Sequence, residues 1–218
     1  MVLRVLMIGL VLMCGVGCES GQAVEKDLPR VLLIGDSICS GYYKKVKLKL
    51  AGRALVVKQK GNAKHTWNGM EKLDSWLGDE KWDVIHFNWG LWDLAHRNPK
   101  SKNFGHLDKV DGTLTTSLED YEANLWSLVK DLKATGAVLI WATTTPVPAG
   151  EPGRIQGDAK KYNAVALEMM KAEKIRVNDL HQYAADRGKP SDNNVHTLPD
   201  LSVEVVRVIL EALEGSGK

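Results

Sequence analysis

Cysteine is scarce in this chain, with three among 218 residues. Two of them, Cys14 and Cys18, lie in the N-terminal segment 1–18, so that only Cys39 remains in the body of the chain. An internal disulfide framework is therefore excluded. Excess charge is also lacking, because the formal net charge is +2 and Lys and Arg are scattered. The densest basic stretch, residues 44–49, is typical of the solvent face of a helix. A nucleic-acid-binding protein usually carries a strong basic stripe, so this partner class is not expected.

Long apolar runs are lacking as well. The apolar run at residues 5–13 is shorter than the roughly 20 residues that a membrane span requires. It follows the basic residue Arg4 and precedes a segment of small residues that ends at Cys18. This layout predicts an export signal over residues 1–18, which the mature protein would lose.

The end of that segment, "GVGC", resembles a bacterial lipobox, although Gly15 stands where such boxes prefer leucine. The resemblance favours lipidation of Cys18 over the alternative of a plain secretory signal with an incidental cysteine. Residues 19–28 are then a polar tether, and residues 29–218 form one domain of a length that can bury a single substantial core. We expect an exported protein of the periplasm or cell envelope that meets the membrane only through its N-terminal lipid.

From residue 30 onward, apolar strand-like segments alternate with amphipathic helix-like segments, each often closed by a glycine such as Gly78 or Gly136. This alternation predicts a parallel sheet covered by helices on both faces. The polar stretch 97–116 is expected to be an insertion or a flexible loop over the site. Strands are expected at residues 30–34, 54–57, 83–88, 137–142 and 175–177, and helices at 41–50, 68–77, 117–135, 158–173 and from 199 onward.

Polar residues follow the strands at the edge where parallel sheets carry their sites. A serine nucleophile needs a base and an orienting group for that base, and the oxyanion needs hydrogen-bond donors. Ser37 follows the first strand and His196 precedes the last helix, so the pair has the order of a nucleophile and its base. The alternative is that Ser37 only caps a helix. The donors expected for the oxyanion are the backbone amides of Ser37 and Gly61 and a side-chain amide near the third strand.

Four short motifs carry a family resemblance: "GDS" at residues 35–37, Gly61 in "GNAKHT", "GLWD" at 90–93 and "NNVH" at 193–196. Together they resemble the SGNH, or GDSL-type, hydrolases, and "LIWATTTPVP" at 139–148 resembles their secreted bacterial members. The resemblance implies a flavodoxin-like three-layer α/β/α fold and ester hydrolysis through an acyl-serine intermediate. It implies Ser37 as nucleophile, His196 as general base, and the amides of Ser37 and Gly61 as oxyanion donors. It implies no metal and no organic cofactor.

Two motifs depart from the family pattern. In the third block Trp92 occupies the position of the family's oxyanion asparagine. We expect Asn88, at the end of the same strand, to replace that donor; the alternative is that Asn88 only satisfies backbone groups at the strand end. In the last block the position three before His196 is Asn193 where the family has aspartate. We expect the preceding residue, Asp192, to orient the imidazole, with Asn193 as the alternative.

The expected substrates are acyl or acetyl esters, on carbohydrate or another small molecule. Trp89 and Trp92 could stack on a sugar ring, with Asp93 beside them, or the two tryptophans could pack beneath the long loop. The altered motifs leave a second function open, a catalytically impaired domain that binds glycan without cleaving it. A nucleotide-binding protein is not favoured, because no Gly-Lys-Ser/Thr follows the first strand. The histidines show no metal-ligand spacing.

Overall fold

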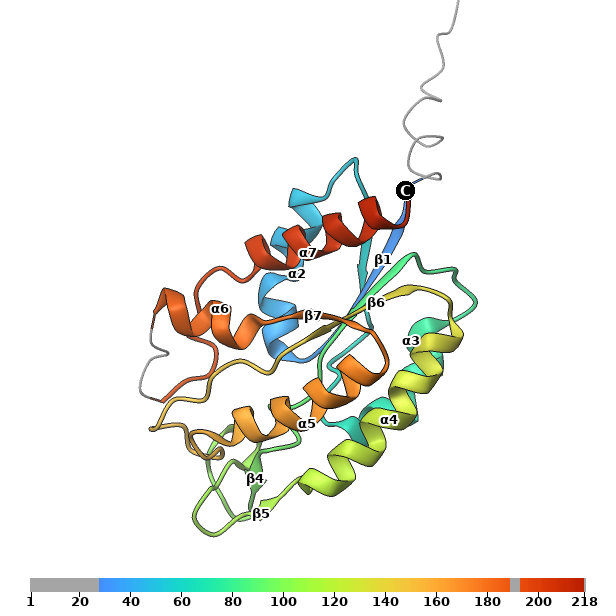
Figure 1. Ribbon diagram of the computed structural model, residues 1–218. Helices are drawn as coiled ribbons and strands as arrows, with labels where there is room; N and C mark the ends of the chain where they lie inside the picture. The colour runs from blue at the N-terminus through green and yellow to red at the C-terminus, as the bar shows by residue number, and fades with distance from the viewer. Residues whose placement is uncertain (1–27, 189–192, 218) are drawn as a thin grey trace, which may run out of the picture.

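The computed structural model describes residues 28–188 and 193–217. The predicted signal segment with Cys18 lies outside the described residues, as does nearly all of the tether. A five-stranded sheet of order β2-β1-β3-β6-β7 forms the centre of the molecule (Figure 1), and every pair of neighbouring strands in it is parallel. Its strands are β1 (Arg30–Ile34), β2 (Leu55–Lys58), β3 (Val84–Phe87), β6 (Val138–Ala142) and β7 (Arg176–Asn178).

Helices cover both faces of this sheet, which Figure 1 shows as two groups on its opposite sides. Each group closes its own hydrophobic core. The middle strands are buried on both faces, so their residues read as continuous apolar runs rather than as an alternation. One face carries α2 (Ser37–Lys49), α6 (Leu180–Arg187) and α7 (Ser202–Gly215), and the other carries α3 (Thr66–Leu77), α4 (Leu118–Ala134) and α5 (Asp158–Ala172).

The predicted three-layer α/β/α arrangement is confirmed, and most elements lie within a few residues of their expected bounds. Helix α4 begins as its sequence indicates, because the Ser117 side chain accepts a hydrogen bond from the backbone amide of Asp120. Helix α6 was not predicted. It is only 8 residues long, too short for a clear apolar stripe, and Asp179 caps it.

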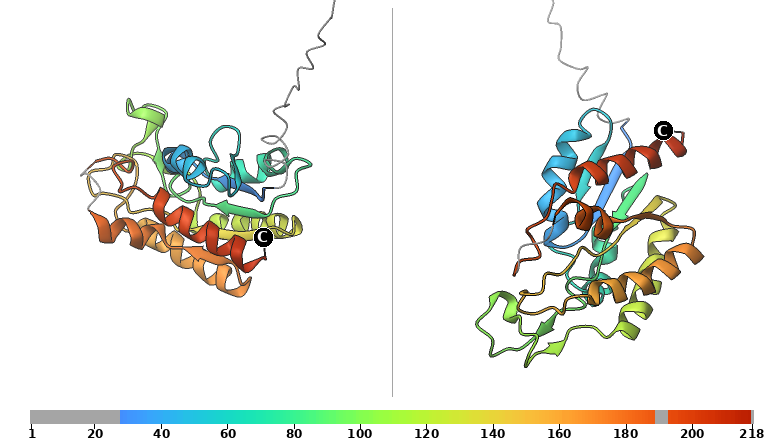
Figure 2. Two further views of the ribbon diagram at one scale, coloured as in Figure 1. Left: turned by 90° about the horizontal axis from the view of Figure 1, so that it is seen from above. Right: turned by 60° about the vertical axis from the view of Figure 1, so that its left-hand side comes forward.

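The polar stretch after β3 is a folded insertion rather than a loose loop. It contains β4 (His96–Arg97), the short helix η1 (Phe104–His106) and β5 (Thr113–Leu114). Backbone bonds dock it on the loop after β6, including one from the His96 amide to the Gly153 carbonyl at 2.7 Å. A side chain at position 153 would lie 2.5 Å from Leu107, so glycine permits this close approach. Figure 2 shows the insertion standing out from the body of the molecule.

Within the described ranges, the structure contains no helix that is both long enough and apolar enough to cross a membrane.

Candidate active site

The site is built around the turn that joins β1 to α2. A Cβ atom at Gly35 would lie 2.6 Å from the Cβ of Cys39, so glycine lets the strand turn directly into the helix. Asp36 is the N-cap of α2, and its carboxylate accepts a hydrogen bond from the Ile38 amide at 2.8 Å. Ser37 is the first helical residue. Since Asp36 already caps the helix, the alternative that Ser37 serves as the cap does not hold, and its hydroxyl remains available for other contacts.

The buried side chain of Gln59, which follows β2, holds the turn between β1 and α2 in place. Its amide nitrogen donates to the Gly35 carbonyl at 2.5 Å, and its oxygen accepts from the Gly35 amide at 3.3 Å. Sequence reasoning missed Gln59, whose only signal is a polar residue directly after a buried strand.

Burial raises the pKa of Asp36, and burial also raises the pKa of the Cys39 thiol to about 12. Cys39 is thus a buried apolar residue, as expected, and not a second nucleophile.

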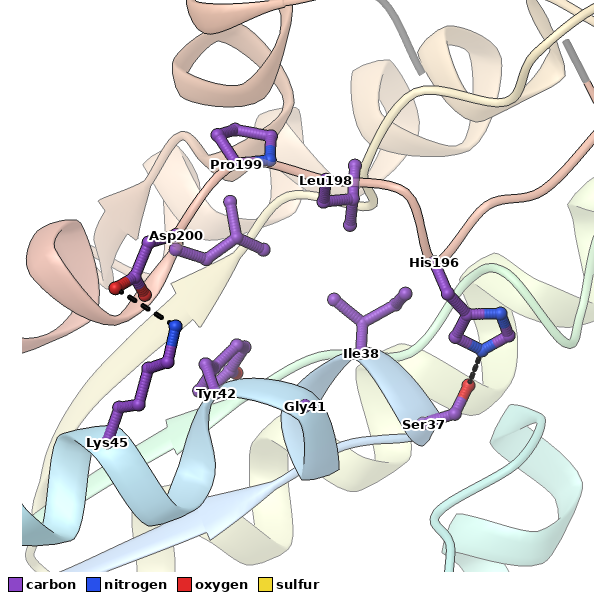
Figure 3. Close-up of a pocket in the computed structure, with 10 residues that line it drawn as sticks. Ser37, Ile38, Gly41, Tyr42, Lys45, His196, Leu198, Pro199 and Asp200 are labelled. Carbon is purple, nitrogen blue, oxygen red and sulfur yellow. Dashed lines mark hydrogen bonds and ion pairs between the residues drawn. The ribbon is translucent and has the colours of Figure 1, made fainter. Parts of the chain in front are cut away.

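Ser37 and His196, which lie 159 positions apart in the chain, are hydrogen-bonded. The Ser37 Oγ to His196 Nε2 distance is 2.8 Å, and Figure 3 shows the imidazole above the start of α2. This distance is within the range that proton transfer from a serine to its base requires. The buried Val195, which packs in the core beneath α3, α4 and α5, anchors the loop that carries His196.

The other ring nitrogen of His196 contacts Asn194. The distance from His196 Nδ1 to Asn194 Oδ1 is 2.9 Å, and the same oxygen accepts the backbone N–H of His196 at 2.9 Å. The backbone donor identifies that amide atom as oxygen, so Nδ1 must carry the ring proton. In the neutral ring, Nε2 is then the acceptor, and the Ser37 O–H donates to it. The tautomer is therefore the one that a general base needs.

Asn194 is a partner of His196 that sequence reasoning missed. The expected partner was placed three or four residues before His196, at helical spacing, whereas residues 195–196 form a turn in which the side chain two positions earlier folds back. Asn193 is exposed and lines a cavity with His196. Asp192 lies outside the described residues, and its contact with His196 stays a prediction.

Replacing Asn194 by alanine is expected to lower kcat by about 10²-fold, because the imidazole loses the group that fixes its tautomer and orientation. Ester turnover under saturating substrate measures this effect. Asp192→Ala is the companion variant. If Asp192→Ala causes the deeper loss of kcat, Asp192 is the orienting group and the contact with Asn194 is secondary.

The predicted oxyanion donors lie in different surroundings. The Ser37 amide belongs to the first turn of α2, where backbone N–H groups have no partner within the helix. Gly61 follows β2 with φ of +81°, a conformation that favours glycine. The next residue, Asn62, lines the same cavity as Ser37 and His196. The roles of the Ser37 and Gly61 amides as oxyanion donors stay predictions.

Asn88 does not match the donor role expected for it. Its side-chain nitrogen donates to the Ala142 carbonyl at the end of β6, at 2.8 Å. It lines neither of the two cavities that Ser37 and His196 line. This geometry corresponds to the alternative, in which Asn88 satisfies the backbone at the edge of the sheet.

The three residues expected to contact substrate divide into two buried and one accessible. Trp89 is 1% exposed and packs in the core. Asp93 is 0% exposed, and its carboxylate accepts hydrogen bonds from the amide and hydroxyl of Thr66 at 2.8 and 2.7 Å. The expectation that Trp89 and Asp93 touch substrate is corrected, since both side chains are enclosed by protein. Trp92 is half-buried and lines the larger cavity.

The carboxyl group of Asp93 is expected to make the stability of the folded protein depend on pH. Burial raises its pKa to about 7, above the roughly 3.9 of an unfolded aspartate. The folded protein thus holds this proton more tightly, and the free energy of unfolding should fall as pH rises from about 4 to about 7. Asp93→Asn removes this titrating group. From about pH 4 to about pH 7, the free energy of unfolding of the wild type should therefore fall by about 2–4 kcal/mol relative to that of the variant. Denaturant unfolding at several pH values measures the difference. Parallel stability curves for the two proteins would rule the explanation out.

Two cavities flank the Ser37–His196 pair. The smaller, about 190 Å³, lies between α2 and the segment before α7, as Figure 3 shows. The larger, about 480 Å³, lies on the side of the insertion. An ester whose carbonyl carbon lies at Ser37 Oγ therefore has one cavity for its acyl group and another for its alcohol.

Within residues 28–188 and 193–217, no group of three or more His, Cys, Asp or Glu side chains is arranged to hold a metal ion.

Comparison of the sequence with protein-family models and with curated proteins gave no match. Solved structures do match. A lipase/acylhydrolase from Enterococcus faecalis shares 20% identity at a TM-score of 0.66, over 87% of this chain and 97% of that one. A GDSL-like lipase from Bacteroides thetaiotaomicron shares 16% at 0.64, over 89% and 90%. An acetylxylan esterase from Geobacillus stearothermophilus, solved as a catalytic mutant, shares 15% at 0.63, over 85% and 94%.

These neighbours define the class of fold. The chain has the α/β fold of the SGNH/GDSL hydrolases, and the predicted resemblance is confirmed at the level of the fold. The further resemblance to secreted bacterial members stays a prediction.

Proposed function

We propose that this protein is an SGNH-type serine hydrolase that cleaves acyl or acetyl esters, with carbohydrate esters as the substrate class. The single observation that carries the proposal is the Ser37 Oγ to His196 Nε2 hydrogen bond of 2.8 Å at the carboxyl edge of a parallel sheet. The described structural neighbours include lipases, acylhydrolases and acetyl xylan esterases, which supports ester hydrolysis as the reaction.

The proposed reaction has two halves. Ser37 Oγ attacks the ester carbonyl carbon while its proton passes to His196 Nε2, and the carbonyl oxygen takes up the negative charge near the amides of Ser37 and Gly61. The bond to the alcohol then breaks, and His196 returns the proton to the departing oxygen. A water molecule, deprotonated by His196, attacks the acyl-serine, which releases the acid and restores Ser37.

Among the described residues, Asn194 is the partner of His196 Nδ1, while the contact of Asp192 with the imidazole stays a prediction. The amide oxygen of Asn194 orients the imidazole but carries no full charge to stabilise the protonated ring. A neutral asparagine holds the histidine in the same way in papain-like proteases, so this arrangement is compatible with turnover.

The experiment is hydrolysis of 4-nitrophenyl acetate by the protein, with fluorophosphonate labelling of the same sample. We expect turnover, and a label that peptide mapping assigns to Ser37. An absence of both would contradict the proposal. The second candidate, a glycan-binding domain without activity, is favoured by Trp92 in the family's asparagine position and by the uncharged Asn194. Binding of acetylated xylan without turnover, unchanged in Ser37→Ala, would support it.

We also propose that the mature protein is exported to the periplasm or cell envelope and carries lipid on Cys18. The support is the sequence layout alone, with Arg4, the apolar run and Cys18 in the order of a lipoprotein signal. The mass of the N-terminal peptide of the mature protein tests this, because a signal cleaved elsewhere would leave Cys18 removed or unmodified.

A further inference from the structure

The larger cavity beside Ser37 contains two arginines that the proposed reaction does not require. Arg97 comes from β4 in the insertion and Arg154 from the loop after β6, and both line the cavity together with Ser37 and His196. Two cations from separate segments thus lie in one hollow with the serine hydroxyl.

Arg154 is held rigidly from beneath. It is 5% exposed, its Nε donates to the Leu91 carbonyl at 2.6 Å, and its Nη1 donates to Glu151 Oε1 at 2.5 Å. Glu151 is itself 2% exposed, and its other oxygen accepts the Gly153 amide. Buried arginines are nearly always paired in this way, because an unpaired charge is costly to desolvate.

Arg97 has no such carboxylate among the described residues. Its guanidinium stacks 4.3 Å from the centroid of the Trp92 ring, and its Nη1 donates to the Gly105 carbonyl. Burial, and then the positive charge of Arg154, lower the pKa of Arg97. The Glu151 carboxylate acts in the opposite direction and raises the pKa of Arg97, but Glu151 is already paired with Arg154. Among the described residues, Arg97 therefore lines the cavity without an ion pair of its own.

The charges of the cavity indicate what it accepts. Among its described lining residues are two guanidinium groups and one carboxylate, Glu151, and these three groups together carry one net positive charge. One positive charge matches a carboxylate better than a dianionic phosphate. Arginine also binds carboxylates through paired, charge-assisted hydrogen bonds. Apolar surface for the body of such a molecule comes from four lining residues, Trp92, Phe104, Leu107 and Pro152.

We propose that the larger cavity binds the alcohol part of an ester that carries a carboxylate, such as an O-acetylated acidic sugar, with Arg97 as the specificity-determining residue and Arg154 behind it. This inference rests on the proposed function, because it names the substrate class of the same site. The stacked Trp92, at the position where the family has its oxyanion asparagine, then acts as the support of Arg97.

The test compares two esters that differ only in the charge. Acetate release is measured from an acetylated methyl glucuronoside and from the methyl glucoside acetylated at the same positions. We expect the wild type to have the higher kcat/KM for the uronoside. In Arg97→Gln the ratio of the two kcat/KM values should fall by about 10- to 100-fold, the value of a charge-assisted hydrogen bond. In Arg97→Lys, which keeps the charge, the ratio should fall less.

Arg30→Gln is the matched control. Arg30 also lies over a tryptophan, 5.2 Å from the ring of Trp82. It is the first residue of β1, however, and therefore lies at the opposite end of that strand from Ser37. Its replacement should leave the ratio of the two esters unchanged. Thermal melting of Arg97→Gln verifies that the variant is folded.

Equal kcat/KM for the two esters, or a ratio that Arg97→Gln does not change, would overturn this inference while ester hydrolysis itself stands. If neither ester is hydrolysed and Ser37 takes no fluorophosphonate, the proposed function fails instead. Calorimetric binding of the two sugars then decides: tighter binding of the uronoside that is lost in Arg97→Gln supports the inference, and equal binding overturns it.

Discussion

Replacing Ser37 by alanine is expected to lower ester turnover at least about 10⁴-fold. The reason is geometric. Ser37 Oγ is the hydroxyl that lies 2.8 Å from His196 Nε2, and alanine leaves no atom that can attack the ester carbonyl. Hydrolysis of 4-nitrophenyl acetate measures the loss, and fluorophosphonate labelling should disappear in the same variant.

The matched control is Ser40→Ala. Ser40 lies one turn further along α2, is exposed, and donates its hydroxyl proton to the Asp36 carbonyl at 3.1 Å. This variant removes a serine hydroxyl from the same helix without touching the cavities, so turnover should stay near that of the wild type. A Ser37→Ala protein that keeps most of its turnover would show that another residue is the nucleophile.

Replacing His196 by alanine is expected to cause a loss of similar size, because Ser37 is a weak nucleophile without its base. The two residues should act as one unit, so the double variant should be no slower than either single variant. Turnover of the two single variants and the double variant forms a mutant cycle that measures this coupling directly.

Added imidazole distinguishes a base from a structural residue. His196 is exposed, so imidazole from solution should enter the space left in His196→Ala and restore part of the turnover. Losses in the two single variants that multiply in the double variant would contradict the assignment, because independent effects do not arise from one proton transfer.

The arrangement of the sheet was predictable because each strand and helix carries its own pattern. The apolar run of β1 and the capped, amphipathic α4 were identified from local sequence, and parallel strands with helices between them leave few possible topologies. The structure confirms the resulting three-layer fold. Helix α6 and the strands β4 and β5 inside the expected insertion escaped prediction, since their stability comes from docking on other segments and not from their own periodicity.

The site was only partly predictable for a related reason. Ser37 was recognised because it directly follows β1, and the edge of a parallel sheet is where chemistry gathers. Trp89 and Asp93 lie in the loop that follows β3 and looked equally accessible, yet both are buried. Both lie against α3, where Thr66 donates to the Asp93 carboxylate and Gly69 makes room for the Trp89 ring. Which residues of a strand-end loop face a cavity thus depends on the helices that pack on that loop.

The sequence by itself determined the layers, the position of Ser37 after the first strand and the presence of a late histidine. These features depend on residue spacing over one turn or one strand, where periodicity and short motifs are sufficient. Only the tertiary structure decided that Asn194 contacts the imidazole, that Asn88 bonds to the end of β6, and that Arg97 and Arg154 line one cavity beside the serine. Each of these arrangements depends on side-chain directions that loop backbone and distant segments set, and no local pattern encodes such directions.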